Sequence, residues 1–172
     1  MKSIIIIFFF PLMALSQTVH LNKNEIEYKG QFDAAAGKGE LYTIAKSFLQ
    51  KKIGKIHHTI ISENTDKDEV VAYGTVKLHT PYSLIRTLHY TISLNADKEK
   101  LKYHIDSVYL VETSRGFSTK KISSEDLVKS MDITGPVAAQ TEQLLNEIDM
   151  NFQMLLDLLH NDIKQTKSSE KK

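Results

Sequence analysis

The chain has 172 residues, of which 41% are hydrophobic and 25% are charged, and these fractions are typical of a globular protein. Its 22 basic and 21 acidic residues nearly balance, so no net charge favours nucleic acid or an anionic membrane as a partner. Because cysteine is absent, disulfides, thiol nucleophiles and the acylated cysteine of bacterial lipoproteins are excluded.

A signal peptide is predicted over residues 1–16. Lys2 precedes an apolar run at residues 4–15, and the small residues Ala14 and Ser16 stand at positions −3 and −1 of a cleavage site. This run is shorter than the roughly 20 residues that a membrane-spanning helix needs. We therefore expect an exported protein, periplasmic or secreted from a Gram-negative bacterium, whose mature chain has no transmembrane segment.

A strand followed by a helix is predicted next. Residues 25–32 alternate apolar and charged side chains, as a half-buried strand does. The stretch "GKGELYTIAKSFLQKK", residues 37–52, lacks the Gly-x-x-x-x-Gly-Lys-Ser/Thr spacing of a phosphate-binding loop, so we interpret its glycines as a joint into a helix. Five apolar residues of this stretch share one helical face: Leu41, Ile44, Ala45, Phe48 and Leu49.

Two hairpins are predicted after this helix. Residues 55–63 and 70–79 flank the polar turn "NTDKDE", and "RTLHYTISL" and "LKYHIDSVYL" flank "NADKEK". In the second pair every other residue is apolar, which indicates one buried and one polar face. Residues 111–135 show no sustained period, so we interpret them as a loop with a short helix that begins near Ser123.

A long helix is predicted from Gly135-Pro136 onward, with a disordered polar tail at residues 166–172. The chain then forms a single α+β domain over residues 17–165: an antiparallel sheet with two helices on one face, in the order β-α-β-β-β-β-α. The apolar stripe of the last helix comprises Val137, Thr141, Leu144, Leu145, Ile148, Phe152, Leu155, Leu156, Leu159 and Ile163.

Residues 25–110 resemble a bacterial family of unknown function, whose members are exported proteins of Gram-negative bacteria with a TBP-like fold. The resemblance implies no catalytic residues, because none is established for the family, and the name of the fold implies no DNA binding. The residues that carry it are Leu41, Tyr42, Ala45, Phe48 and Leu49 of the first helix, and Tyr90, Ile92, Tyr103 and Ile105 of the second hairpin.

A candidate metal site lies on the polar face of the second hairpin. If the hairpin is symmetric about its loop, Leu94 pairs with Leu101, and His89 then lies opposite Asp106. His104 would lie opposite Thr91, within diagonal reach of both. Two imidazoles and a carboxylate form a ligand set that zinc accepts, although the same residue types are ordinary on a solvated sheet face.

The last helix provides a candidate binding surface. About 28 residues give a helix of roughly 42 Å, which exceeds the roughly 24 Å width of a five-stranded sheet unless the helix follows the strands. Met150, Met154 and Leu158 lie on a flank beside its apolar stripe. This flank is either ordinary core or a contact with another copy, another protein or a lipid, since Met-rich surfaces suit adaptable binding.

We therefore expect a non-catalytic binding or accessory module of the cell envelope, with no cofactor and no nucleic-acid partner. Its partner is an envelope protein, or a second copy that associates through the C-terminal helix. Two alternatives remain open: a carrier in which the long helix grips a curved sheet around a lipid or hydrophobic small molecule, and a metal-dependent hydrolase that uses His89, His104 and Asp106.

Overall fold

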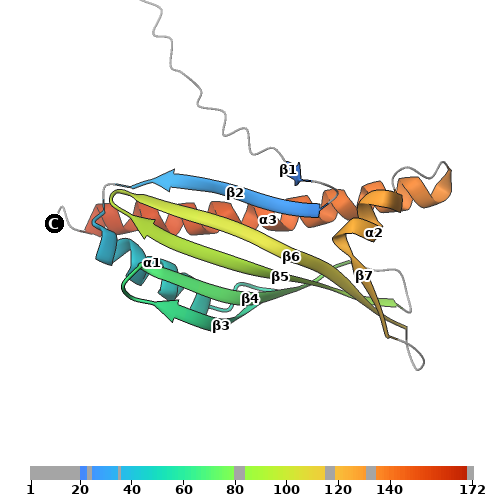
Figure 1. The fold of residues 1–172 in the computed structure, drawn as a ribbon, viewed down its shortest axis with the longest axis horizontal. Coiled ribbons are helices and arrows are strands. Elements are labelled where there is room, and N and C mark those ends of the chain that lie inside the picture. Colours follow the sequence, from blue (N-terminus) through green and yellow to red (C-terminus); the bar gives the residue numbers. More distant parts are fainter. Residues whose placement is uncertain are drawn as a thin grey trace, which may run out of the picture.

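The structure, a computed structural model, describes residues 20–22, 25–34, 36–79, 84–114, 119–130 and 135–169. The predicted signal peptide and the last residues of the predicted tail lie outside this part of the chain. The elements are β1 (His20–Asn22), β2 (Glu25–Asp33), α1 (Lys38–Gln50), β3 (Ile56–Asn64), β4 (Glu69–Lys77), β5 (Leu84–Asp97), β6 (Lys100–Ser114), β7 (Thr119–Ser123), α2 (Ser124–Lys129) and α3 (Pro136–Ser169) (Figure 1).

All strands pair antiparallel in one sheet, in the order β1-β2-β6-β5-β4-β3. The long strand β6 has two partners on the same edge, because β2 pairs with its first half and β7 with its second half. The predicted strand at residues 25–32 and both predicted hairpins are confirmed. The interpretation of residues 111–135 as a loop was wrong in part, because β6 continues to Ser114 and β7 follows.

The short helix predicted near Ser123 is α2. Ser123 is its N-cap, and its hydroxyl accepts a 3.1 Å hydrogen bond from the backbone N–H of Asp126. Strand β7, with the sequence "TKKIS", has only five residues and shows no apolar alternation. A strand so short produces no period in the sequence, which explains why it was missed.

The predicted register of the β5–β6 hairpin was wrong. Asp97 pairs with Lys100 across a two-residue turn, so most of "NADKEK" belongs to the strands and Leu94 pairs with Tyr103 rather than with Leu101. A β-bulge then shifts the register again near Tyr90. There, Ser107 adopts a φ of 52°, and beyond it His89 pairs with Tyr109 rather than with Asp106.

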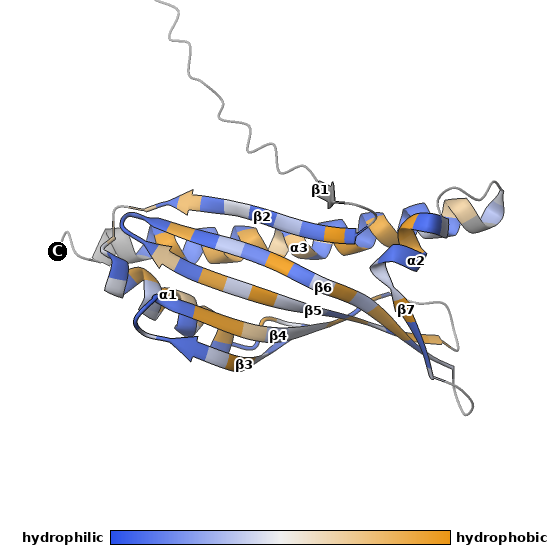
Figure 2. Ribbon diagram, viewed as in Figure 1, coloured by the Kyte–Doolittle hydropathy of each residue, from blue (hydrophilic) through white to orange (hydrophobic). Residues whose placement is uncertain are grey.

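Helices α1 and α3 cover the same face of the sheet and contact each other. Phe48 of α1 and Phe152 of α3 are each only 1% exposed and belong to one hydrophobic core. Hydrophobic and hydrophilic residues alternate along β5 and β6 (Figure 2), so one face of the sheet supplies the core and the other does not. We call the uncovered side the open face.

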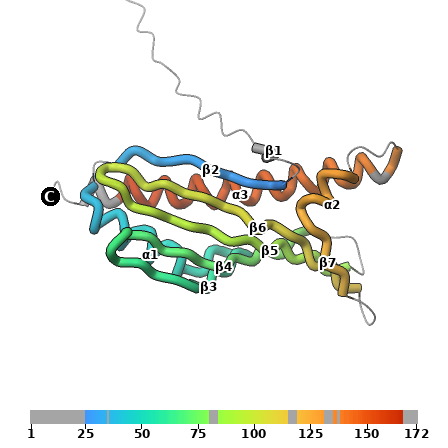
Figure 3. The backbone as a smooth tube through the Cα atoms, viewed as in Figure 1, coloured from blue at the N-terminus to red at the C-terminus, as the bar shows by residue number. Residues whose placement is uncertain are grey.

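Helix α3 follows the strands instead of crossing them. It lies lengthwise behind β2 and β6, and its N-terminal turns continue beyond the start of β2 (Figure 3). Its 34 residues measure about 51 Å, close to the roughly 50 Å of the 15-residue strand β6. The helix also continues to Ser169, so the first residues of the predicted disordered tail are helical.

Candidate functional site

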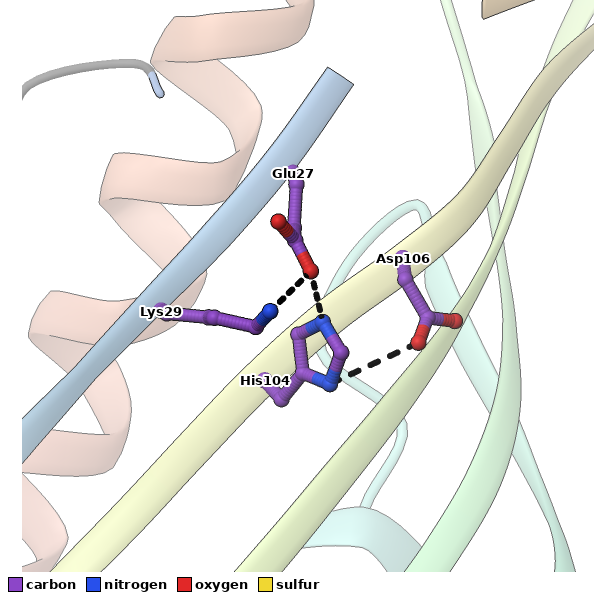
Figure 4. Close-up of polar contacts among 4 residues, drawn as sticks. All are labelled: Glu27, Lys29, His104 and Asp106. Atoms are coloured by element: carbon purple, nitrogen blue, oxygen red, sulfur yellow. Dashed lines mark hydrogen bonds and ion pairs between the residues drawn. The ribbon is translucent and has the colours of Figure 1, made fainter. Parts of the chain in front are cut away.

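A carboxylate–imidazole cluster lies on the open face where β2 pairs with β6. Glu27 and Lys29 come from β2, and His104 and Asp106 come from β6; α3 lies on the other side of the sheet (Figure 4). The side chains share this face because each alternates along its strand with a buried residue, such as Tyr28 or Ile105.

His104 lies between two carboxylates. Its Nε2 is 2.5 Å from Oε1 of Glu27, and its Nδ1 is 3.5 Å from Oδ2 of Asp106. Lys29 forms an ion pair with the same Glu27 oxygen. A neutral imidazole has a single N–H and satisfies one carboxylate, whereas an imidazolium can donate to both. The cluster therefore presents an imidazole between two carboxylates on the open face, with Lys29 beside one of them.

A polar hollow of about 290 Å³ adjoins this cluster. Its lining combines the carboxylates of Glu25, Glu27 and Asp106 with the hydroxyl groups of Ser107 and Ser124, and Ile26 completes it. The start of β2, the bulge in β6 and the first residue of α2 meet here. The left-handed Ser107 of the bulge therefore contributes to the shape of the hollow.

A second cluster of aromatic side chains lies further along the open face. The hydroxyl of Tyr73 in β4 contacts Nδ1 of His89 in β5 and lies 3.1 Å from the hydroxyl of Tyr109 in β6. The rings of His89 and Tyr109 stack with centroids 4.7 Å apart and planes within 2°. Nζ of Lys121 in β7 lies 4.0 Å from the centroid of the Tyr109 ring. Four strands thus contribute to this aromatic cluster.

Partial burial changes the acidity of this aromatic cluster. Desolvation, and then the positive charge of Lys121, lower the pKa of His89. Desolvation and the hydrogen bond with Tyr109 raise the pKa of Tyr73 to about 12. Both side chains are therefore held in their neutral forms at neutral pH.

The structure does not assemble the predicted metal triad of His89, His104 and Asp106. His104 and Asp106 are neighbours on β6, as expected, but His104 pairs with Ser93, four residues along β5 from His89. Those four residues correspond to about 13 Å. Within the described ranges of the chain, no three His, Cys, Asp or Glu side chains lie close enough to hold one metal ion.

The Gly-Lys-Gly motif lies at the start of α1, where a joint was predicted. Gly37 is the N-cap of the helix with extended backbone, and no side chain caps the helix there. Lys38 forms a 2.5 Å ion pair with Asp68 of the β3–β4 turn. The motif therefore connects β2 to the first helix and attaches that helix to the neighbouring hairpin.

The flank of α3 is exposed in part. Met150 is 68% exposed and Met154 46%, whereas Leu158 is half-buried and packs against the core. Met150 also lines a groove of about 1280 Å³ between α3 and the start of β5. On the β5 side of this groove, Arg86 forms a 2.5 Å ion pair with Glu112. We call this the α3 groove.

Five residues of the two open-face clusters were not identified from the sequence: Glu27, Lys29, Tyr73, Tyr109 and Lys121. The alternation along β2 and β4 places Glu27, Lys29 and Tyr73 on the correct face. Continued along β6, it would place Tyr109 on the buried face, because the bulge at Ser107 reverses the alternation. Lys121 lies in the short strand β7, which shows no alternation. The pattern does not show which residues meet across strands, because that depends on the register. Even a correct prediction of the two-residue turn at Lys98-Glu99 would not have revealed the bulge at Ser107.

No protein-family model matches the chain, and no curated protein matches it. Two solved structures have a similar fold. A TBP-like protein from Parabacteroides distasonis gives a TM-score of 0.68 at 12% sequence identity, over 85% of this chain and 97% of the other. A DUF4468 family protein from Bacteroides ovatus gives a TM-score of 0.57 at 11% identity, over 83% of this chain and 90% of the other.

The chain thus has the TBP-like α+β fold. At sequence identities of 11–12%, the similarity shows the fold alone. Both similar structures come from bacteria, as the sequence resemblance implied. The predicted resemblance to bacterial proteins of unknown function with a TBP-like fold is confirmed at that level. In the described part of the chain, no helix is long and apolar enough to cross a membrane.

Proposed function

We propose that this chain is a non-catalytic binding module of the bacterial cell envelope that engages a protein partner through its open face. The observation that carries this proposal is the one-sided cover of the sheet. Helices α1 and α3 cover one face, whose residues form the core, while the other face keeps a layer of half-buried polar and aromatic side chains. An uncovered sheet face that combines aromatic and polar side chains is a surface to which a protein partner can bind.

The composition of the open face supports a protein partner. Tyrosine is enriched in protein interfaces because its ring packs while its hydroxyl forms hydrogen bonds, and Tyr73 and Tyr109 are already ordered by their mutual contact. Ordered side chains lose little entropy on binding. The half-buried residues of this face on β4 and β5 are Glu69, Val71, Tyr73, Thr75, Thr87, His89, Thr91, Ser93, Asn95 and Asp97.

The location in the envelope rests on the N-terminal sequence. The apolar run at residues 4–15, preceded by Lys2 and followed by small residues, supports export, and the lack of cysteine argues against a lipoprotein anchor. Detection of the mature chain beginning at Gln17 in a periplasmic or culture fraction would support this part of the proposal. Retention of residues 1–16 on a cytoplasmic protein would contradict it.

A site-specific photocrosslinking experiment tests the use of the open face. A crosslinking side chain is placed at Thr91 on the open face or, as a control, at the exposed Asp157 of α3, and the protein is expressed in its native host. We expect a defined crosslinked product from Thr91 alone. Addition of Thr75→Arg should abolish that product while the thermal midpoint stays unchanged. Products from Asp157 alone would contradict the proposal.

A second candidate function is self-association through α3, which the exposure of Met150 and Met154 favours. Truncation after Met150 is a poor test, because it would also remove Phe152 and the buried leucines that follow it. Sedimentation velocity of a Met150→Lys, Met154→Lys variant is better, since both side chains face solvent. A concentration-dependent dimer in the wild type that is lost in the variant would support this candidate, and a monomer in both would reject it.

The two remaining alternatives have less support. A carrier needs space between the long helix and the sheet. At the middle of α3 this space is filled, because the ring of Phe152 packs edge-on against Tyr28 and Tyr90, with centroids 4.9 and 5.0 Å away. The α3 groove does provide space, but charged side chains such as Arg86 and Glu147 contribute to its lining. A metal-dependent hydrolase needs His89 and His104 together, and they belong to separate clusters.

A further inference from the structure

Two tyrosine–histidine contacts lie back to back at the same place in the sheet. On the helix-covered face, the hydroxyl of Tyr90 in β5 lies 2.9 Å from Nε2 of His58 in β3. The tyrosine reaches two strands away because Gly74 of β4 lies between them, and a Cβ at Gly74 would be 2.3 Å from the Tyr90 ring. The contact therefore depends on the missing side chain in β4.

The second contact uses the preceding residue of each strand, on the open face. Tyr73 precedes Gly74, and His89 precedes Tyr90, so these side chains point to the other side of the sheet. The Tyr73 hydroxyl contacts Nδ1 of His89. Strand β5 is thus attached to β4 through one face and to β3 through the other at consecutive positions.

Both contacts lie beside the β5–β6 bulge. Pairing moves from His89 with Tyr109 to Thr91 with Asp106, which leaves Ser107 and Val108 opposite Tyr90. The regular ladder of β5 and β6 is interrupted there. At this point the two contacts join β5 to β3 and β4, and the stacked rings of His89 and Tyr109 join β5 to β6 across the bulge.

The environment of each histidine disfavours the charged form. Nδ1 of His58 is buried without a hydrogen-bond partner among the described residues, and burial, aided by the adjacent His57, lowers the pKa of His58 to about 4. The group facing its ring from β5 is Tyr90. A proton on Nε2 would remove the acceptor for the Tyr90 hydroxyl.

His89 faces groups from three other strands. These are Tyr73 from β4, Tyr109 from β6 and Lys121 from β7. None of them is an anion at neutral pH, and Lys121 is a cation. An imidazolium at this position therefore meets repulsion without a compensating carboxylate.

We propose that the two tyrosine–histidine contacts form an acid-sensitive conformational switch, in which protonation of His58 and His89 opens the sheet at the β5–β6 bulge. The opening breaks the contacts of Tyr73 and Tyr109 with His89. It thereby changes the arrangement of side chains on the open face when the surroundings become acidic. Because the switch concerns the sheet itself, it does not depend on whether the open face binds a partner.

Hydrogen exchange measured at pH 7 and pH 5 tests this switch, with rates corrected for the intrinsic pH dependence. For an opening that exposes His58, a pKa of about 4 in the closed form and 6.5 in the open form predicts an opening about 20-fold more populated at pH 5. Amides of β5 and β6 near the bulge should show this increase. Unchanged protection in the wild type at the two pH values would overturn the proposal.

Glutamine variants separate the switch from general acid effects. A His58→Gln, His89→Gln variant keeps polar side chains that cannot titrate, so its exchange should not change between pH 7 and pH 5. His79→Gln is the control, because His79 is exposed and lies outside both contacts, and it should behave as the wild type. Persistence of the pH dependence in the double variant would also overturn the proposal. If that variant fails to fold, each single variant should show a reduced pH dependence, and an undiminished one contradicts the switch.

Discussion

The hydroxyl of Tyr28 in β2 donates a 2.9 Å hydrogen bond to Oδ1 of Asp149 in α3. The ring of Tyr28 also packs against Phe152, so a polar and an apolar contact together determine the rotation of the helix on the sheet. This rotation directs Met150, the neighbour of Asp149, toward solvent. The contact with Tyr28 and the buried apolar stripe of α3 are therefore consistent with one rotation of the helix, which leaves the methionine flank exposed.

Replacement of Tyr28 by Phe should destabilise the protein by about 1–2 kcal/mol, because it removes the donor to Oδ1 of the partly buried Asp149, whose Oδ2 alone keeps its hydrogen bond from Gln153. Urea unfolding followed by far-UV circular dichroism measures this loss. Tyr42→Phe is the matched control, since the Tyr42 hydroxyl contacts Glu63 on the exposed surface, and its unfolding midpoint should not change. Equal midpoints for wild type and Tyr28→Phe would show that the hydrogen bond contributes nothing.

The protein should lose stability in alkali as buried phenols ionise. Burial, and for Tyr28 also the contact with Asp149, raise the pKa of Tyr28 and Tyr90 well above the ordinary value of 10. A raised pKa in the folded state means that the stabilisation is complete below pH 10 and is lost as the pH rises further. Absorbance at 295 nm should therefore show these tyrosines ionising only as the protein unfolds. Complete ionisation with a midpoint near pH 10 and an unchanged fold would contradict this expectation.

Truncation of Phe152 to Ala should cost about 3–5 kcal/mol, since the ring is 1% exposed and packs against two tyrosine rings. Thermal and chemical unfolding measure the change. Met154→Ala, on the exposed flank of the same helix, is the control and should alter stability by less than about 0.5 kcal/mol. A small cost for Phe152→Ala would mean that α3 does not close the core.

The substitution Gly74→Ala should lower the free energy of unfolding by about 1–3 kcal/mol. The added Cβ would lie 2.3 Å from Cζ and 2.7 Å from the hydroxyl oxygen of Tyr90. Gly39→Ala is the matched control within α1. No atom lies within 4 Å of its added Cβ, so it should stabilise the protein by up to about 1 kcal/mol. If both glycine variants change the free energy of unfolding in the same direction, the close approach of Tyr90 is not the cause of the destabilisation at Gly74.

The core was largely predictable from the sequence. The alternation along β5 and the spacing of apolar residues in α1 and α3 reflect burial on one side, and that burial determines where Leu88, Phe48 and Phe152 lie. The open-face clusters were not predictable, because they depend on which residues face each other across strands. A two-residue turn and the left-handed Ser107 set that register, and neither leaves a trace in the hydrophobic period.

The position of β2 beside β6 and against α3 has a consequence for how the chain acquires its structure. Strand β2 lies early in the sequence, but it pairs with β6 near residue 105, and its Tyr28 packs on Phe152. Strand β2 therefore reaches its native contacts only when the last third of the chain is present. Contacts between such distant segments form slowly. During synthesis the nascent chain therefore emerges from the ribosome without a completed core, and the native state forms only after its final helix is released.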